Sequence, residues 1–137
     1  MLYEHEIEIR VRYQETDAQG RVHHANYLTY FELGRTELLR AAGIEYRVIE
    51  AEGWMLVVAE MNVKYFLPAS YDDLLRLRTT LTEARGARCV NKYQVFRGEE
   101  LLVEGESVLA CINRQGRVTR LPTALLFKGE KGAGAGD

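Results

Sequence analysis

Four strand-like segments follow one another in the second part of the chain, with only short turns between them. The segments are long and rich in apolar and β-branched residues, and the turns read PASYDD, ARGAR and RGEE. Long strands joined by turns this short run in opposite directions as neighbours, so the pattern predicts an antiparallel meander. The four segments are residues 54–67, 72–84, 87–97 and 100–113.

A strand and two helices are predicted before the meander. Residues 5–13 alternate between apolar and charged side chains, which is typical of a half-buried strand ending at Tyr13. From Ala25, apolar residues recur at helical spacing to residue 41 or 42, and Gly43 supplies a stop signal. A shorter helical segment is predicted at 46–52.

One long helix beside an antiparallel sheet of about five strands is an α+β arrangement. Gly34, in the middle of the helix, costs about 1 kcal/mol relative to Ala. We interpret it as a point where the helix backbone packs closely on a strand. Segment 54–67 is apolar at both alternating positions near its start, which predicts burial on both faces and favours a homodimer that covers or extends the sheet.

The length of 137 residues, 47% of them hydrophobic, predicts one domain, which we place at residues 1–128. Within it, residues 117–122 are predicted to end the sheet and residues 123–128 to form a short helical turn. The Gly- and Ala-rich residues 129–137 are predicted to be a disordered tail.

The charge pattern argues against two kinds of partner. The formal net charge is −2 and no run of basic residues occurs, which disfavours nucleic acid and anionic lipid. No stretch of about 18 apolar residues and no signal-peptide core are found, so we predict no membrane insertion and a cytoplasmic location.

The two cysteines are predicted to be free, buried thiols. A turn that pairs Arg97 with Glu100 would place Cys89 opposite Val108 and Cys111 opposite residue 86. The thiols are then not opposite each other, and cytosolic disulfides are rare.

The loop of residues 14–24 gathers titratable side chains immediately before the long helix. Taken singly, each has a structural explanation: Asp17 can brace a turn, Glu15 reads as an exposed loop acid without a catalytic role, and Tyr13 can belong to the core. Together they precede a helix N-terminus, where free N–H groups favour negative charge. A carboxylate beside N–H donors is the minimum equipment for hydrolysing an activated ester.

Other chemistries fit the residues less well. His5, Asp17, His23 and His24 could be metal ligands, but their spacing matches no zinc pattern, so no metal site is predicted. No G-x-S-x-G elbow supports a serine triad. Glu32 lies three residues before Arg35 and is expected to form a surface ion pair; it remains a reserve candidate for a catalytic acid.

The block Y-x-E-T-D-A-x-G-x-V-x-H-A-N-Y-x-x-Y-F-E-x-x-R, from Tyr13 to Arg35, resembles the signature of the 4-hydroxybenzoyl-CoA thioesterase-like family of hotdog-fold acyl-CoA thioesterases. The resemblance extends to about Phe127. It implies a long helix wrapped by a curved antiparallel sheet, a dimer whose sheets join edge to edge, often a tetramer built from dimers, and CoA thioester hydrolysis at the dimer interface. CoA is part of the substrate, so no cofactor is implied.

The resemblance also assigns roles to residues of the loop. Asp17 matches the catalytic carboxylate, acting as nucleophile or general base, and the absence of an H-G-G motif favours it over Glu32. Tyr13 and His24 match the aromatic residue and the histidine that shape the site. The polar residue at the helix start and the oxyanion N–H donors match Asn26 and the backbone near His24 and Ala25.

Other positions bear on the substrate. His23 stands where many members have tyrosine and others asparagine, so the acyl preference is left open. Among the surface cations, Lys64 and Arg88 are candidates for the CoA phosphates. The alternative function is a hotdog dimer that binds acyl-CoA or acyl-carrier protein without turnover. Dehydratase chemistry is disfavoured because no histidine is predicted to face a carboxylate on a partner strand.

Overall fold

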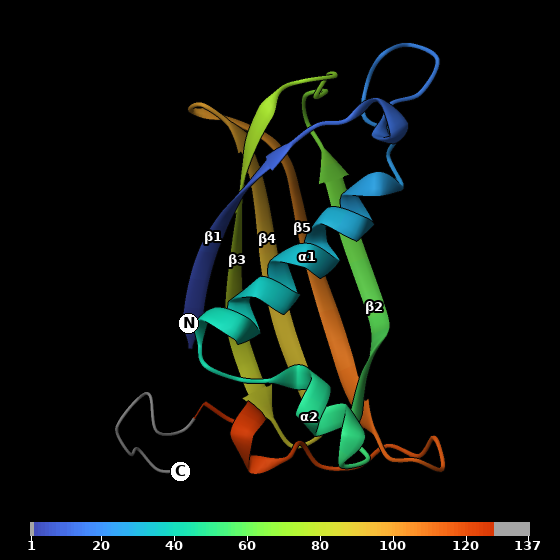
Figure 1. The fold of residues 1–137 in the computed structure, drawn as a ribbon, viewed down its shortest axis with the longest axis vertical. Helices are drawn as coiled ribbons and strands as arrows, with labels where there is room; N and C mark the ends of the chain where they lie inside the picture. Colours follow the sequence, from blue (N-terminus) through green and yellow to red (C-terminus); the bar gives the residue numbers. More distant parts are fainter. Residues whose placement is uncertain (1, 128–137) are drawn as a thin grey trace.

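The computed structural model, which describes residues 2–127, is a curved five-stranded antiparallel sheet with one long helix lying across its concave face (Figure 1). The sheet order is β1-β3-β4-β5-β2. The elements are β1 (Tyr3–Arg10), η1 (Tyr13–Glu15), α1 (Asn26–Ala41), α2 (Tyr46–Ala51), β2 (Met55–Tyr65), β3 (Leu74–Arg85), β4 (Arg88–Arg97), β5 (Glu100–Ile112) and η2 (Thr123–Leu125). The predicted α+β class and the long helix are confirmed. The predicted four-strand meander is confirmed only for β3, β4 and β5. Residues 66–73 carry the chain across the end of the sheet, so β2 pairs with β5 at the edge and not with β3.

Two segments differ from the sequence prediction. The first strand ends at Arg10 instead of Tyr13, because the chain leaves the sheet after Val11 and forms the short 3₁₀ turn η1. Residues 117–122 do not form a further strand; only an isolated bridge joins Val118 to Ile112. The helical turn predicted at 123–128 is present as η2. The predicted domain end at residue 128 and the tail 129–137 lie outside the described residues.

The close approach of α1 to the sheet, expected at Gly34, is confirmed. A Cβ atom on Gly34 would overlap Thr79 Oγ1 and would lie 2.7 Å from Leu77 Cδ2, both on β3. The helix packs mainly on β1 and β3. Glycine therefore allows the helix backbone to approach β3 directly.

The core consists of two apolar clusters separated by a layer of buried polar side chains. The cluster nearer the loop includes Phe31 and Tyr93, and the other includes Leu38 and Leu109. Between them, each of the three central strands places one polar residue on the inner face: Thr79 on β3, Asn91 on β4 and Ser107 on β5. Buried polar groups need hydrogen-bond partners, so this layer is where a ligand or water could be accommodated.

A bulge changes the predicted cysteine register. The turn pairs Arg97 with Glu100 as expected, but the register shifts between Val95 and Phe96, so Cys89 lies opposite Leu109 and not Val108. The Cys111 N–H donates to the carbonyl of Ala87. Both thiols are buried and free, as predicted, and burial raises the pKa of Cys89 to about 12.

Strand β2 forms one edge of the sheet. It pairs with β5 on one side and, within residues 2–127, with no strand on the other. Met55 and Val58 remain about half exposed, at 46% and 49%. The predicted burial of this strand on both faces is therefore not achieved within one chain. No helix among the described residues is long and apolar enough to cross a membrane.

Candidate functional site

Asp17 sits at the start of a tight turn in the loop between β1 and α1. Its N–H donates to the carbonyl of Arg21 (2.7 Å), and the turn closes through Gly20, whose φ of +80° favours glycine. The Asp17 Oδ1 atom accepts hydrogen bonds from the N–H groups of Gln19 (2.8 Å) and Arg21 (3.2 Å). These bonds, that from Gln19 foremost, lower the pKa of Asp17, so its exposed carboxylate is anionic at neutral pH.

Glu15 is not the exposed loop acid that the sequence suggested. It is 8% exposed, and its carboxylate accepts hydrogen bonds from the Arg12 N–H (2.9 Å), the Arg12 guanidinium (2.9 Å) and the Tyr30 hydroxyl (2.8 Å). Burial alone would raise the pKa of Glu15, but these hydrogen bonds outweigh it and leave the pKa lowered. Glu15 thus ties the start of the loop to α1.

The junction between loop and helix leaves one backbone donor available. The Ala25 N–H, a predicted oxyanion donor, instead meets His23 Nδ1 at 3.1 Å. The N–H groups of Asn26, Tyr27 and Leu28 are directed to carbonyls of the preceding turn. Within residues 2–127, the His24 N–H has no hydrogen-bond acceptor, so it is the donor that remains for a ligand.

The two histidines and Asn26 hold this junction together. The rings of His23 and His24 stack with centroids 4.3 Å apart. The His24 carbonyl accepts a hydrogen bond from the Tyr65 hydroxyl at 3.0 Å, which joins the junction to the end of β2. The Asn26 side chain donates to the Glu15 carbonyl at 2.8 Å. The Asn26 side chain therefore positions the loop by binding the loop backbone at Glu15.

Asp17 and His24 line a cleft of about 340 Å³ between the loop, the start of α1 and the end of β2. The walls on the β2 side are Tyr65, Phe66, Leu67 and Pro68, and Tyr27 contributes from α1. Burial raises the pKa of Tyr27 to about 12, so its hydroxyl stays protonated at neutral pH. The cleft combines an anionic carboxylate with apolar walls.

Sequence reasoning missed three of the residues that the end of β2 brings to the cleft. Phe66 to Pro68 are about forty residues from the loop, and only the pairing of β2 with β5 at the edge of the sheet places them there. Tyr27, on the buried side of α1, is 2% exposed and also lines the cleft. The one available signal was Pro68, which directly follows the predicted segment 54–67; the strand itself ends at Tyr65.

Tyr13 lies outside the cleft and outside the core. Its side chain is 72% exposed and stacks on Tyr71 with ring centroids 3.9 Å apart. The strand ends before it, so its side chain does not continue the apolar face of β1. Its predicted role in shaping the site remains a prediction.

Within one chain, neither Lys64 nor Arg88 lies at the cleft. Met61 and Val63 face the core, so Lys64 points to the opposite face of the sheet, beside Lys92 and Glu104. Arg88 begins β4 at the far end of the sheet and pairs with Glu83 at 3.3 Å. A role in binding CoA phosphates is untested for both.

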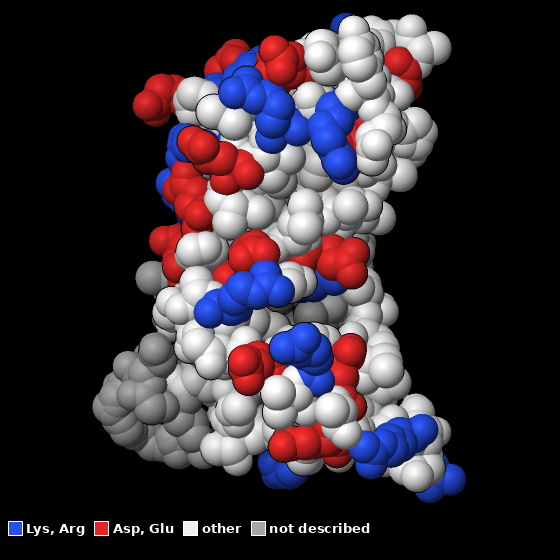
Figure 2. Space-filling view, in the orientation of Figure 1, with Lys and Arg blue, Asp and Glu red and all other residues white. Residues whose placement is uncertain are grey.

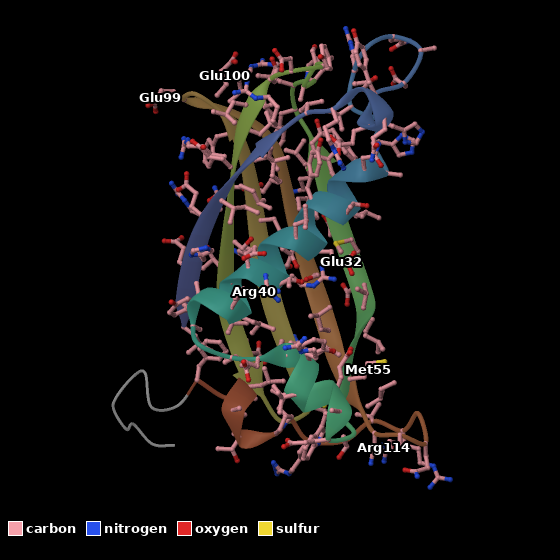
Figure 3. All side chains as sticks on the ribbon, viewed as in Figure 1. Glu32, Arg40, Met55, Glu99, Glu100 and Arg114 are labelled. Atoms are coloured by element: carbon pink, nitrogen blue, oxygen red, sulfur yellow. The ribbon has the colours of Figure 1, made fainter. Side chains whose placement is uncertain are left out.

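The reserve candidate Glu32 is exposed on α1, on the side that faces β2 (Figure 3). It forms no ion pair with Arg35 among the described residues; Arg35 instead donates to the Tyr93 hydroxyl at 3.3 Å. In the same part of the chain no three His, Cys, Asp or Glu side chains are grouped as metal ligands would be.

Comparison with known proteins gives a consistent picture. Residues 11–128 match the family model described as the thioesterase-like superfamily. The acyl-CoA thioester hydrolase YbgC of Escherichia coli is 38% identical over 106 residues, which cover 77% of this chain and 79% of that protein. The acyl-CoA thioesterase YbgC of Haemophilus influenzae is 34% identical, over 77% of this chain and 78% of that protein.

Solved structures agree. The DHNA-CoA thioesterase from Staphylococcus aureus superposes with a TM-score of 0.83 and 32% sequence identity, covering 86% of this chain and 80% of that chain. The likeness therefore includes both the fold and the sequence over most of the molecule.

Proposed function

Since the chain belongs to the thioesterase-like superfamily and is a thioester hydrolase, we propose that its substrates are acyl-CoA thioesters, which it cleaves to the free acid and CoA. The relatives named above act on acyl-CoA and on DHNA-CoA. The thiolate of CoA is a good leaving group, so the reaction needs a nucleophile or base and a donor for the oxyanion, without a strong general acid.

The anionic Asp17 at the cleft is the observation that carries this proposal. One of its oxygens is fixed by two backbone N–H groups, so the carboxylate is held in one orientation. As a nucleophile, it would attack the thioester carbonyl, expel the thiolate and leave an acyl-aspartyl anhydride for water to hydrolyse. As a general base, it would take a proton from the water that attacks the carbonyl. The lowered pKa keeps the anionic form that both routes require.

The negative charge that develops on the thioester oxygen needs a hydrogen-bond donor. The His24 N–H is free of protein acceptors in the described chain and lies at the start of α1, where the helix dipole adds to its effect. The Ala25 N–H could join it if the His23 ring turned away from its present contact. We assign His24 as the main oxyanion donor.

We further propose a homodimer that pairs across the free edge of β2, with tetramers built from such dimers. The cleft is walled by residues at the end of this edge strand, and Phe66 and Leu67 are 51% and 42% exposed. A second subunit along β2 would cover these apolar side chains and enclose the cleft. It could also bring Lys64 or Arg88 of the second subunit toward the CoA phosphates.

Thiol release from a panel of acyl-CoAs tests the function. Short aliphatic, long aliphatic and aromatic acyl groups should be compared, each with and without EDTA. We expect hydrolysis of at least one class and no loss of rate on chelation. Loss of rate with EDTA that a divalent ion restores would replace the metal-free mechanism with a Lewis-acid one.

Binding without turnover is the second candidate function, and an exposed carboxylate that also braces a turn is compatible with it. Saturable binding of acyl-CoA with no thiol release from any member of the panel would favour that reading.

A further inference from the structure

A second cavity lies under the middle of α1, away from the loop. Its volume is about 170 Å³. A cavity of about 150 Å³ can hold a benzene molecule, so this one can hold the end of a small organic group. Its walls include Glu32 and Arg35 from α1, Leu81 from β3, Cys89 and Asn91 from β4, and Leu109 from β5.

Asn91 is a polar side chain in the wall of this cavity that has no hydrogen bond from the described residues. The side chain is 4% exposed and lies on the inner face of β4, between Cys89 and Tyr93. Ser107, its neighbour in the polar layer, shares a 2.6 Å hydrogen bond with the Tyr93 hydroxyl, whereas the Asn91 amide forms no hydrogen bond with any residue from 2 to 127. Among the described residues, the fully buried side-chain N or O atom without a partner is Thr79 Oγ1, which does not line this cavity. The Asn91 amide is instead open to the cavity, so the occupant of the cavity completes its hydrogen bonding.

The charged side chains around the cavity determine which functional group of a ligand binds there favourably. Arg35 contributes one positive charge, while Glu32 and Glu50 contribute two negative charges. Figure 2 shows that acidic and basic side chains are interspersed on this face of the molecule. A carboxylate would be repelled by the two acids. A hydroxyl group is neutral, and it both donates and accepts, which matches the two functions of the Asn91 amide.

The Asp17 cleft and this cavity both lie between α1 and β2, but they share no lining residue: Tyr65 of β2 lines the cleft and Leu56 of β2 lines the cavity. Leu28, Glu32 and Arg35 are spaced by four and three residues, so they lie on one stripe of the helix. In Figure 3 Glu32 is on the β2 side of α1. With a rise of 1.5 Å per residue, Glu32 and Arg35 in the cavity wall lie about 12 to 16 Å beyond His24 along the helix axis. An extended chain advances about 1.2 Å per bond, so this distance corresponds to roughly ten to fourteen bonds.

We propose that this cavity binds a hydroxyl group at the distal end of an extended acyl chain whose thioester lies at Asp17, and that Asn91 is the residue that selects for it. The inference rests on the proposed function, because it assigns a substrate class to the same site. The apolar side chains of Leu81 and Leu109 would pack against the last carbons of the chain.

The test compares three substrates that differ only in their hydroxyl group: dodecanoyl-CoA, ω-hydroxydodecanoyl-CoA and β-hydroxydodecanoyl-CoA. One hydrogen bond to a buried amide should raise kcat/KM for the ω-hydroxy substrate over dodecanoyl-CoA by about five- to tenfold. Asn91→Leu, which keeps the size of the side chain, should abolish this preference while dodecanoyl-CoA is still hydrolysed. Equal rates for the two substrates in the wild type would overturn the proposal, as would a preference for the β-hydroxy isomer.

Two controls separate this inference from the proposed function. Ser107→Ala alters the same polar layer outside the cavity and should leave the preference intact; loss of the preference in this variant as well would overturn the role of Asn91. Thermal melting with free ω-hydroxydodecanoic acid measures binding without turnover. We expect it to raise the Tm of the wild type more than dodecanoic acid does, and not to do so in Asn91→Leu. If no acyl-CoA is cleaved but this difference is observed, the proposed function fails and the cavity assignment stands; if cleavage occurs without the difference, the assignment fails.

Discussion

The two carboxylate oxygens of Asp17 have different surroundings. Oδ1 accepts two backbone hydrogen bonds from the turn that it begins, whereas no residue in the described chain bonds Oδ2. A side chain that only braced the turn would need the first oxygen and no charge, because an amide oxygen can accept the same bonds. Catalysis requires the negative charge of the carboxylate, whereas bracing the turn does not. A substitution that removes only the charge can therefore separate the catalytic role of Asp17 from its structural role.

Asp17→Asn should leave the fold intact and lower kcat by at least about a hundredfold, because it keeps an oxygen acceptor for the turn and removes the anion that attacks or activates water. Thiol release and thermal melting measure the two effects. Glu32→Gln is the matched control, since it removes an acid of the same charge from the exposed face of α1. If the Asn variant keeps near wild-type rates while the Gln variant is inactive, the chemistry belongs on the helix.

Glu15→Gln should destabilise the protein by about 1 to 3 kcal/mol at neutral pH, because a buried carboxylate that accepts three hydrogen bonds is replaced by an amide. The folded-state pKa of Glu15 lies below its ordinary value of 4.5. Its contribution is therefore complete above that pH and is lost as the pH falls through the folded-state pKa.

The difference in Tm between the wild type and Glu15→Gln should accordingly shrink as the pH is lowered from neutral to below about 4. Glu99→Gln, in the exposed turn between β4 and β5, should show no difference at either pH. A difference for Glu15→Gln that stays constant with pH would mean that its shape, and not its charge, stabilises the loop.

At the scale of elements, the spacing of apolar residues in the sequence predicts the type and bounds of a helix or strand. The long helix begins and ends within about one residue of the predicted bounds, because one apolar stripe and a stop at Gly43 define it. The burial of Glu15 depends on Tyr30, fifteen residues away, and no local pattern encodes that contact. The cysteine register was wrong by one residue because a bulge inserts Leu102 into β5 between the partners of Val95 and Phe96, and the apolar run 101–103 does not reveal which residue is the extra one.

In the candidate site, too, the residues of the local motif were predicted and those brought in by distant parts of the chain were not. The loop motif identified Asp17 and His24, which the structure does bring to one cleft. It could not identify the β2 wall of that cleft, or the hydrogen bond that occupies the Ala25 N–H, since both depend on the three-dimensional path of the chain.

Gly34→Ala tests the packing of α1 on β3. In an exposed helix this change would stabilise by about 1 kcal/mol. Here the added Cβ would lie 2.7 Å from Leu77 Cδ2, so we expect net destabilisation of about 1 to 3 kcal/mol, measured by urea unfolding. Thr29→Ala, on the exposed face of the same helix, should be close to neutral. A more stable Gly34→Ala variant would show that α1 can move away from the sheet at little cost.

At the scale of the whole molecule, the position of the site is informative. The cleft is at the edge of the sheet, where β2 lacks a second neighbour among the described strands. Sites that catalyse acyl transfer benefit from the exclusion of water, which strengthens the electrostatic interactions within them. One chain leaves Phe66 and Leu67 exposed at this cleft, so the isolated chain does not provide that environment.

Val58→Lys should therefore weaken both assembly and catalysis. Val58 is 49% exposed on the edge strand β2, and a lysine on a free edge opposes pairing with a second strand. In sedimentation velocity we expect the wild type to be at least a dimer at micromolar concentration. The variant should shift toward the 15.7 kDa monomer and lose thiol release in proportion. Val48→Lys places the same charge on α2, outside the edge strand itself, and should change neither property. A wild-type monomer with full activity would contradict the shared interface, and the cleft of a single chain would then have to exclude water by itself.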